Sequence, residues 1–195
     1  MDNATQEKLF AAAIPLFAKK GYAAVSIREI AKAADINVSS ISYYFRGKEG
    51  LYHAIVEEHV KAIAESILSA EKLAPEERLR HYAQGICEVH TKKPYVTRFL
   101  QSELVNPTSA MDQILKKNIF SFYRFLNKAI QDGIDTGLFR SDVNVHHAAL
   151  SLAGILNFYF IAKPLFRDFL DTSLNADADY VEQALDIYLE GIRRK

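Results

Sequence analysis

Residues 26–51, SIREIAKAADINVSSISYYFRGKEGL, constrain the fold more than any other stretch of this chain. Ser26 and Glu29 form an S-x-x-E capping box, in which the hydroxyl accepts from the Glu29 N–H and the carboxylate reaches back to the Ser26 N–H. Behind this cap, apolar residues recur at the spacing of one helix face: Ile27, Ile30, Ala31 and Ala34. The pattern predicts a helix of about two turns, too short to bury a core of its own.

A second short helix follows after a tight turn. Asp35 occupies the bend, and aspartate is among the few residues other than glycine that tolerate the left-handed backbone region. Asn37 is suited to cap the next helix, whose Ile41 and Phe45 share one face at i and i+4. Two short helices with this connection are typical of a helix-turn-helix.

The face of the second helix that lies opposite Ile41 and Phe45 is small and rich in hydroxyl groups. Hydroxyls exchange hydrogen bonds with base edges, and valine packs on a thymine methyl group. Tyr43, Tyr44 and Lys48 are suited to phosphate contacts, and the free N–H groups at the helix start near Lys48 form an anion site. We therefore expect this face to enter the major groove of DNA through Val38, Ser39, Ser40, Ser42 and Tyr43.

Basic residues are concentrated around this element. Between Lys19 and Lys48 the chain has six lysines and arginines, at 19, 20, 28, 32, 46 and 48, against two acids, at 29 and 35. The whole chain has a formal net charge of zero, so the local excess of four is a patch and not a bulk property. Such patches supply the salt-dependent part of DNA affinity.

At these residues the sequence resembles the TetR family of bacterial transcriptional repressors. The similarity covers about the first third of the chain and rests on FAKKGY (17–22), SIREIAKAADI (26–36) and ISYYFRGKEGLY (41–52). It implies DNA contacts at Ser26, at Arg28, on the exposed face of residues 38–43 and at Lys48. Asp35 replaces the usual glycine of the turn. Ser42 stands where many members have a phosphate-binding tyrosine, a task that Tyr43 or Tyr44 is placed to perform.

Composition fits an all-α cytoplasmic protein with a sizeable core. Of 195 residues, 49% are apolar, and only eight are glycine and five proline. The single cysteine, Cys87, permits no internal disulfide. The apolar run Leu9–Ala18 is expected to be an amphipathic helix and not a signal peptide, since no basic segment precedes it. The run Ala148–Ala162 is shorter than a membrane span and predicts a buried helix.

The remaining pattern adds seven helices to the two short ones, so that about nine helices and no strand are predicted. Pro15 predicts a bend or a late start in the first. We expect residues 1–50 to form the helix-turn-helix domain, the helix from 48 to about 72 to link it onward, and residues 51–195 to form a second helical domain. The seven helices are expected at 4–20, 48–72, from Pro75, from Pro94, at 109–136, at 144–162 and from Asp177 to about 193. Asn144 is expected to cap the sixth of these, which Pro164 ends, and Asp177 to cap the last.

The resemblance implies that this second domain encloses a ligand cavity and that its last two long helices form a dimer interface. For any single aromatic residue there, core packing is favoured over ligand contact by roughly two to one. Phe158, Tyr159 and Phe160 are consecutive, point about 100° apart on a helix and so cannot all face one core. The candidate ligand residues are His90, Arg98, Phe99, Phe120, Tyr123, Asn157 and Phe158.

Some polar residues have two interpretations. Asn157 could bind a ligand or fix the register of a dimer seam, as buried asparagines do in coiled coils. His90 and Cys87 could form a metal pair, but a packed histidine and a buried thiol are favoured, and no metal or cofactor is expected. Arg98 and Glu103 could be surface charges; a cavity-facing Arg98 would imply an acidic or acyl ligand.

We therefore expect a homodimeric repressor that a small, largely apolar effector releases from a palindromic operator in double-stranded DNA. The alternative is a constitutive DNA-binding factor whose C-terminal half serves dimerisation or a protein partner. An enzyme is not expected, since the sequence has no nucleophile–base pair, H-E-x-x-H motif or phosphate loop.

Overall fold

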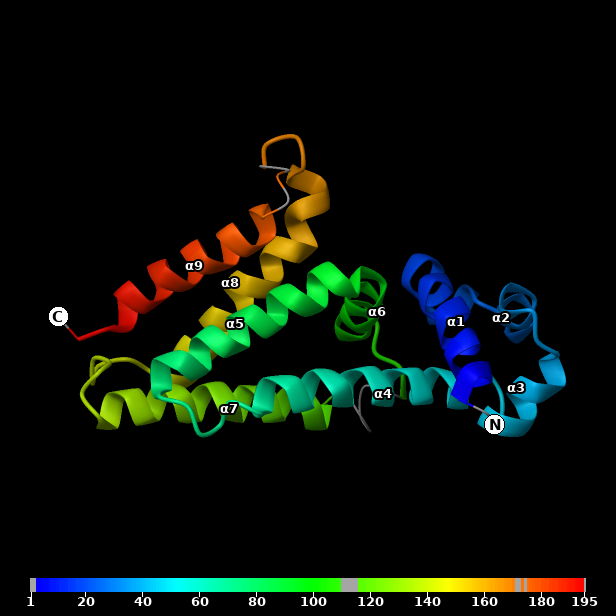
Figure 1. Ribbon diagram of the computed structural model, residues 1–195, viewed down its shortest axis with the longest axis horizontal. Coiled ribbons are helices and arrows are strands. Elements are labelled where there is room, and N and C mark those ends of the chain that lie inside the picture. Colours follow the sequence, from blue (N-terminus) through cyan, green and yellow to red (C-terminus); the bar gives the residue numbers. More distant parts are fainter. Residues whose placement is uncertain (1–2, 110–115, 171–172, 174, 195) are drawn as a thin grey trace. The chain divides into compact units, whose positions relative to one another are not determined.

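The computed structural model describes residues 3–109, 116–170, 173 and 175–194, and within them the fold is all-α, as the sequence predicts (Figure 1). The only extended pairing in this part of the chain is an isolated antiparallel bridge between Phe139 and Arg193. The described helices are α1 (Asn3–Ala24), α2 (Ile27–Ala34), α3 (Val38–Phe45), α4 (Lys48–Leu68), α5 (Pro75–Lys92), α6 (Pro94–Val105), α7 (Lys116–Asp135), α8 (Val145–Phe166) and α9 (Ala176–Ile192).

Side-chain caps begin three of these helices where the sequence places them. The Ser26 hydroxyl accepts from the Glu29 N–H at 3.1 Å before α2. The Asn37 carbonyl oxygen accepts from the Ser39 N–H at 2.9 Å before α3. Asn144 accepts from the His147 N–H at 3.0 Å before α8. These local hydrogen bonds depend on residues at most three apart, which is why a sequence pattern can predict them.

Other helix ends differ from the predictions. Helix α1 begins at Asn3 and passes through Pro15; its non-helical residue is Gly21, with φ 77° and ψ 161°. Helix α8 continues through Pro164 to Phe166. Helix α9 begins one residue before Asp177, which does not cap it, because this carboxylate binds Tyr159 and Lys163 instead. Ser109, the start predicted for the helix at 109–136, is helical, and residues 110–115 lie outside the described residues.

Contacts within the chain divide it into two compact units. Unit 1 contains the described residues within 1–62 and 93–118, and unit 2 those within 63–92 and 119–195. Helix α6 thus belongs with the N-terminal helices, and it packs mainly on α1. The division therefore does not follow sequence order, because α6 returns to the first unit after α5 has contributed to the second.

The core of unit 1 is aromatic. Phe17, Tyr52 and Phe99, from α1, α4 and α6, are almost fully buried. The Tyr52 ring meets Phe17 edge-on at 4.9 Å between centroids and Phe99 at 4.8 Å, and Tyr22 joins the cluster at 4.6 Å from Tyr52. Edge-to-face pairs of this kind add to the hydrophobic effect of burial. This cluster joins three helices, none of which belongs to the helix-turn-helix.

The core of unit 2 lies between α5, α7, α8 and α9. Leu79, Leu126, Leu152 and Leu189 are almost fully buried in it. Helix α8, with 22 residues and an 18-residue stretch of mean hydropathy 1.5, is the one helix in the described part of the chain that is long and apolar enough to cross a membrane, judged by length and composition alone. Leu152 and Leu156 are buried on one of its faces, whereas Leu150 and Phe158 are exposed on the other. The prediction of a buried helix is therefore wrong for the second face, because no other described helix covers it.

Gly133 lets the Phe139 ring pack directly against α7. A Cβ atom placed on it would lie 2.1 Å from a ring carbon of Phe139, whose side chain is fully buried. We expect Gly133→Ala to lower the free energy of unfolding by about 1–3 kcal/mol because the ring must move. Thermal and urea unfolding measure this loss. Gly191→Ala is the matched control, since a Cβ there meets no atom within 4 Å; an equal loss in both variants would contradict the steric explanation.

Candidate nucleic-acid interface and candidate ligand residues

The turn between α2 and α3 and the turn after α3 both have left-handed backbone. Asp35 has φ 53° and Arg46 has φ 59°, and Gly47 follows with φ 111°. Ile41 is fully buried, and the Phe45 ring lies 6.1 Å from that of Phe10 on α1. These contacts hold one face of α3 against the rest of unit 1 and leave the opposite face at the surface.

The exposed face of α3 contains the residues that the sequence predicts for base contacts. Ser39, Ser42 and Tyr43 are exposed, and Val38 and Ser40 are partly so. Tyr43 is 81% exposed, and its ring meets Tyr44 edge-on at 4.9 Å. Two large aromatic side chains that are held against each other at the end of a surface helix are well placed to contact phosphates.

Basic side chains flank this face, but they are not equally available. Arg28 is exposed and has no hydrogen-bond or ion-pair partner among the described residues. Lys20 instead donates to Glu29 at 2.5 Å. This bond, with a smaller contribution from the Ser26 backbone, lowers the pKa of Glu29. Arg28, which the sequence predicts as a DNA contact, is therefore available for a phosphate or base contact on α2.

Lys48 has a structural task that the sequence does not reveal. Its Nζ donates to the carbonyl oxygens of Tyr22 and Val25, both at 3.0 Å, and lies 4.3 Å from the centre of the Tyr22 ring. The first turn of α4 is thereby tied to the end of α1. A third N–H remains on the ammonium group, so phosphate contact by Lys48 stays a prediction beside this structural role.

Two candidate ligand residues lie on α6 in unit 1. Arg98 is exposed, and Phe99 is fully buried in the aromatic cluster with Phe17 and Tyr52. The neighbouring Glu103 is only 1% exposed, so the expectation of a surface charge there is wrong. Glu103 is buried because three donors surround it: the Tyr52 hydroxyl and, from Thr108, the backbone N–H and the hydroxyl.

In unit 2 the structure brings two candidates together. His90 on α5 and Asn157 on α8 are hydrogen-bonded at 3.2 Å, and the imidazole stacks on Phe160 with 4.1 Å between centroids. Burial lowers the pKa of His90 although Asn157 opposes the shift, which favours a neutral imidazole at pH 7. Burial also raises the pKa of the Tyr82 hydroxyl, another partner of Asn157, to about 12.

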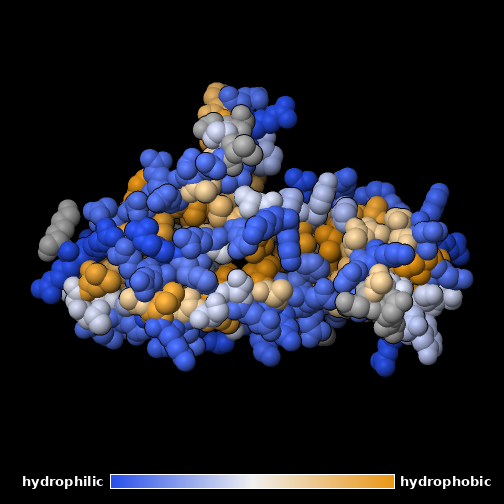
Figure 2. Space-filling model, viewed as in Figure 1, coloured by the Kyte–Doolittle hydropathy of each residue, from blue (hydrophilic) through white to orange (hydrophobic). Residues whose placement is uncertain are grey.

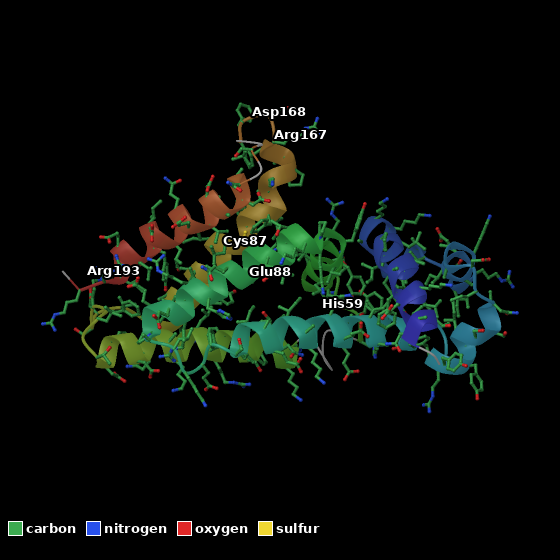
Figure 3. The ribbon with its side chains drawn as sticks, viewed as in Figure 1. His59, Cys87, Glu88, Arg167, Asp168 and Arg193 are labelled. Carbon is green, nitrogen blue, oxygen red and sulfur yellow. The ribbon has the colours of Figure 1, made fainter. Side chains whose placement is uncertain are left out.

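The other candidates in unit 2 are dispersed. Tyr123 donates to or accepts from His146 at 2.7 Å, and Phe120 and Phe158 are 53% and 64% exposed. Cys87, in the C-terminal half of α5 beside Glu88 (Figure 3), is half-buried, and burial raises the pKa of its thiol. The part of the chain that the structure describes contains no group of three or more His, Cys, Asp or Glu side chains placed to hold a metal ion.

Arg28 provides a test of the DNA-binding face. We expect Arg28→Ala to weaken binding to a duplex and to reduce the slope of log K against log salt concentration by about 1 if the guanidinium contacts one phosphate. Fluorescence anisotropy at several salt concentrations measures both quantities. Arg124→Ala, which removes the same charge from the exposed face of α7, should change neither. Unchanged binding by the Arg28 variant would remove this residue from the interface.

Comparisons with known proteins agree with this geometry. The family model "Bacterial regulatory proteins, tetR family" matches residues 9–55, and "Tetracyclin repressor-like, C-terminal domain" matches residues 75–186. The repressor NicS of Pseudomonas putida is 29% identical over 97% of this chain and 93% of its own length. The probable regulator YttP of Bacillus subtilis is 33% identical over 67% of this chain and 62% of its own.

Among solved structures, the hemolysin II transcriptional regulator HlyIIR has 27% identity and a TM-score of 0.72, with 98% of both chains covered. The first family model spans α2, α3 and the start of α4, where the hydroxyl-rich face and the basic patch lie. The second begins with α5 and extends into α9. Together they account for the helix-turn-helix and for the helices that follow it: this chain belongs to the TetR family of bacterial transcriptional regulators.

Proposed function

We propose that this regulator is a homodimeric repressor that binds a palindromic operator and is released from it by a small, largely apolar effector bound in unit 2. The exposed, hydroxyl-rich face of α3 within a basic patch is the observation that carries the DNA-binding part. One copy presents one such face. A two-fold dimer would present two, and spacing them by about one helical turn of DNA, roughly 34–36 Å, would match an inverted repeat.

The second copy is expected on the exposed face of α8. Leu150, Phe158, Ile161 and Leu165 recur at i, i+8, i+11 and i+15, which places them on one side of the helix, and they are 52–79% exposed. This side is opposite to the buried Leu152 and Leu156. A soluble protein seldom leaves so continuous an apolar stripe uncovered. The stripe is therefore suited to pack on its own copy, as an isologous interface requires.

The apolar surface continues past the end of α8 and beside α9. Figure 2 shows hydrophobic side chains at the tip where α8 ends, and Phe169 there is 87% exposed. Arg167 and Asp168 project from the same tip (Figure 3). Along α9 runs a groove of about 880 Å³, lined by Tyr159, Tyr180 and Ile187 and also by acidic residues: Asp179, Glu182, Asp186 and Glu190. These features extend the area that a second copy would cover.

The dimer predicts a clear effect of charge on α8. Phe158→Glu should raise the dimer dissociation constant at least about thirtyfold, because it places a carboxylate in the seam; this corresponds to ~2 kcal/mol. Sedimentation velocity over a concentration series measures the constant. Leu73→Glu, at a 45% exposed residue between α4 and α5, is the matched control and should remain dimeric. A monomeric wild-type protein would refute the dimer.

The effector site is expected near the His90–Asn157 pair. These polar groups belong to α5 and α8, which pack on each other in unit 2, and aromatic side chains surround them. A few convergent polar groups in an apolar setting are typical of a small-molecule site. An effector that bound a non-operator conformation more tightly would shift the dimer away from DNA.

A thermal-shift screen of small apolar and acyl compounds tests this part. A ligand at a hundredfold excess over its dissociation constant should add about 2.7 kcal/mol of stability. The same compound should release the operator, and Asn157→Ala should weaken both effects. A compound that binds without changing operator affinity, in wild type and variant alike, would favour a constitutive DNA-binding factor.

A further inference from the structure

The end of α6 and the loop after it are tied to α4 by a buried polar cluster within unit 1. The Tyr52 hydroxyl, on α4, donates to Oε1 of Glu103, on α6. The second carboxylate oxygen of Glu103 accepts from the Thr108 N–H at 3.1 Å and from the Thr108 hydroxyl at 2.9 Å. The Glu103 side chain thus joins α6 to α4 and to the loop that follows α6. We call Tyr52, Glu103 and Thr108 the α4–α6 clamp.

A second set of contacts ties the same loop to the first turns of α4. The Ser109 hydroxyl donates to Oε1 of Glu49 at 2.7 Å and lies 2.9 Å from Nε2 of His53. Glu49 directly follows Lys48, whose ammonium group is bound to the carbonyl oxygens at the end of α1. The loop therefore contacts the part of α4 that also sets the position of α1.

Because the α4–α6 clamp is buried, it tolerates less displacement of its members than a surface contact would. Glu103 is 1% exposed and Tyr52 is also 1% exposed, so neither can touch DNA directly. Burial, and next the nearby Glu103 carboxylate, raise the pKa of Tyr52, which keeps its hydroxyl protonated as a donor. A carboxylate removed from water is tolerated only while its donors stay in place. The pairing therefore permits one placement of α6 on α4 and disfavours others.

The elements that this placement supports are those that present the DNA-binding face. Two residues separate the end of α3 from the start of α4. Gly50 in the first turn of α4 lies against the Phe45 carbonyl, where an added Cβ would meet the oxygen at 1.7 Å. Helix α6 packs on α1, which in turn packs on α2. A change in the α4–α6 contact would thus reach α3 through α4 and α2 through α1.

We propose that Glu103 and Tyr52 are positioning residues for DNA binding: the clamp sets operator affinity from outside the helix-turn-helix, by fixing α6 and its loop on α4. The inference rests on the proposed operator binding of this regulator. It extends the determinants of DNA affinity from residues 26–48 to a carboxylate more than fifty residues further along the chain. It also assigns a task to Ser109, which holds the same loop from its exposed side.

Three variants separate positioning from stability. Tyr52→Phe keeps the ring in the aromatic cluster and removes one donor from Glu103. Adding Glu103→Leu in this background removes the buried charge, so stability should recover relative to Tyr52→Phe. Ser109→Ala is a mild change at an exposed residue. Binding is measured by anisotropy with a palindromic duplex that the wild-type protein selects from a random-sequence pool, well below each melting temperature.

We expect Tyr52→Phe and the double variant to bind that duplex about tenfold more weakly than wild type, a factor near that of one lost hydrogen bond to a charged group. Ser109→Ala should bind about threefold more weakly, because it loses only the weaker, exposed part of the contact. The active fraction, determined by stoichiometric titration, should remain that of the wild type. Affinity would thus stay low in the double variant although its stability returns.

The matched control is Tyr188→Phe in unit 2, which removes a buried hydroxyl that donates to the Ala148 carbonyl at 3.0 Å. It should lose stability without losing operator affinity. The inference is overturned if the double variant regains affinity together with stability. It is also overturned if Tyr52→Phe and Tyr188→Phe lose the same amount of affinity.

A wild-type protein that selects no duplex would instead refute the proposed operator binding. Wild-type binding with unaffected variants would refute only the role of the α4–α6 clamp.

Discussion

The structure of unit 1 depends on the aromatic cluster that joins α1, α4 and α6. Helices α2 and α3 have eight residues each, and isolated helices of that length are not stable in water. They persist because α2 packs on α1 and on α3, and α1 is joined to α4 and α6 through Phe17, Tyr52 and Phe99. The position of the exposed face of α3 therefore depends on how α1, α4 and α6 pack together.

Two charged residues of unit 1, Lys48 and Glu103, also help to hold these helices together. The ammonium group of Lys48 binds carbonyl oxygens at the end of α1, and the carboxylate of Glu103 binds donors from α4 and from the loop after α6. In each case the charge satisfies several polar groups of other segments at once. Such multiple contacts specify a geometry, since no single one of them can shift without leaving another group unpaired.

In unit 2, helix α8 has apolar residues on two faces, one buried and one exposed. The consecutive Phe158, Tyr159 and Phe160 of α8 are respectively exposed, buried against α9 and stacked on His90. One segment thus contributes to an uncovered stripe, to the core and to the polar pair of the proposed effector site. A ligand that moved α8 at His90 would also act on the stripe, which supports a link between effector binding and dimer geometry.

The sequence by itself determined what depends on short range: the caps at Ser26, Asn37 and Asn144, the left-handed Asp35, the all-α class and the exposed face of α3. These features follow from residues a few positions apart, so a pattern can predict them. Only the tertiary structure decided that Glu103 is buried, that Lys48 binds carbonyl oxygens, that Asp177 pairs with Tyr159 instead of capping α9, and that His90 meets Asn157. Each of these depends on a partner 14 to 67 residues away or on another helix, and spacing along the chain contains no information about which helices pack together.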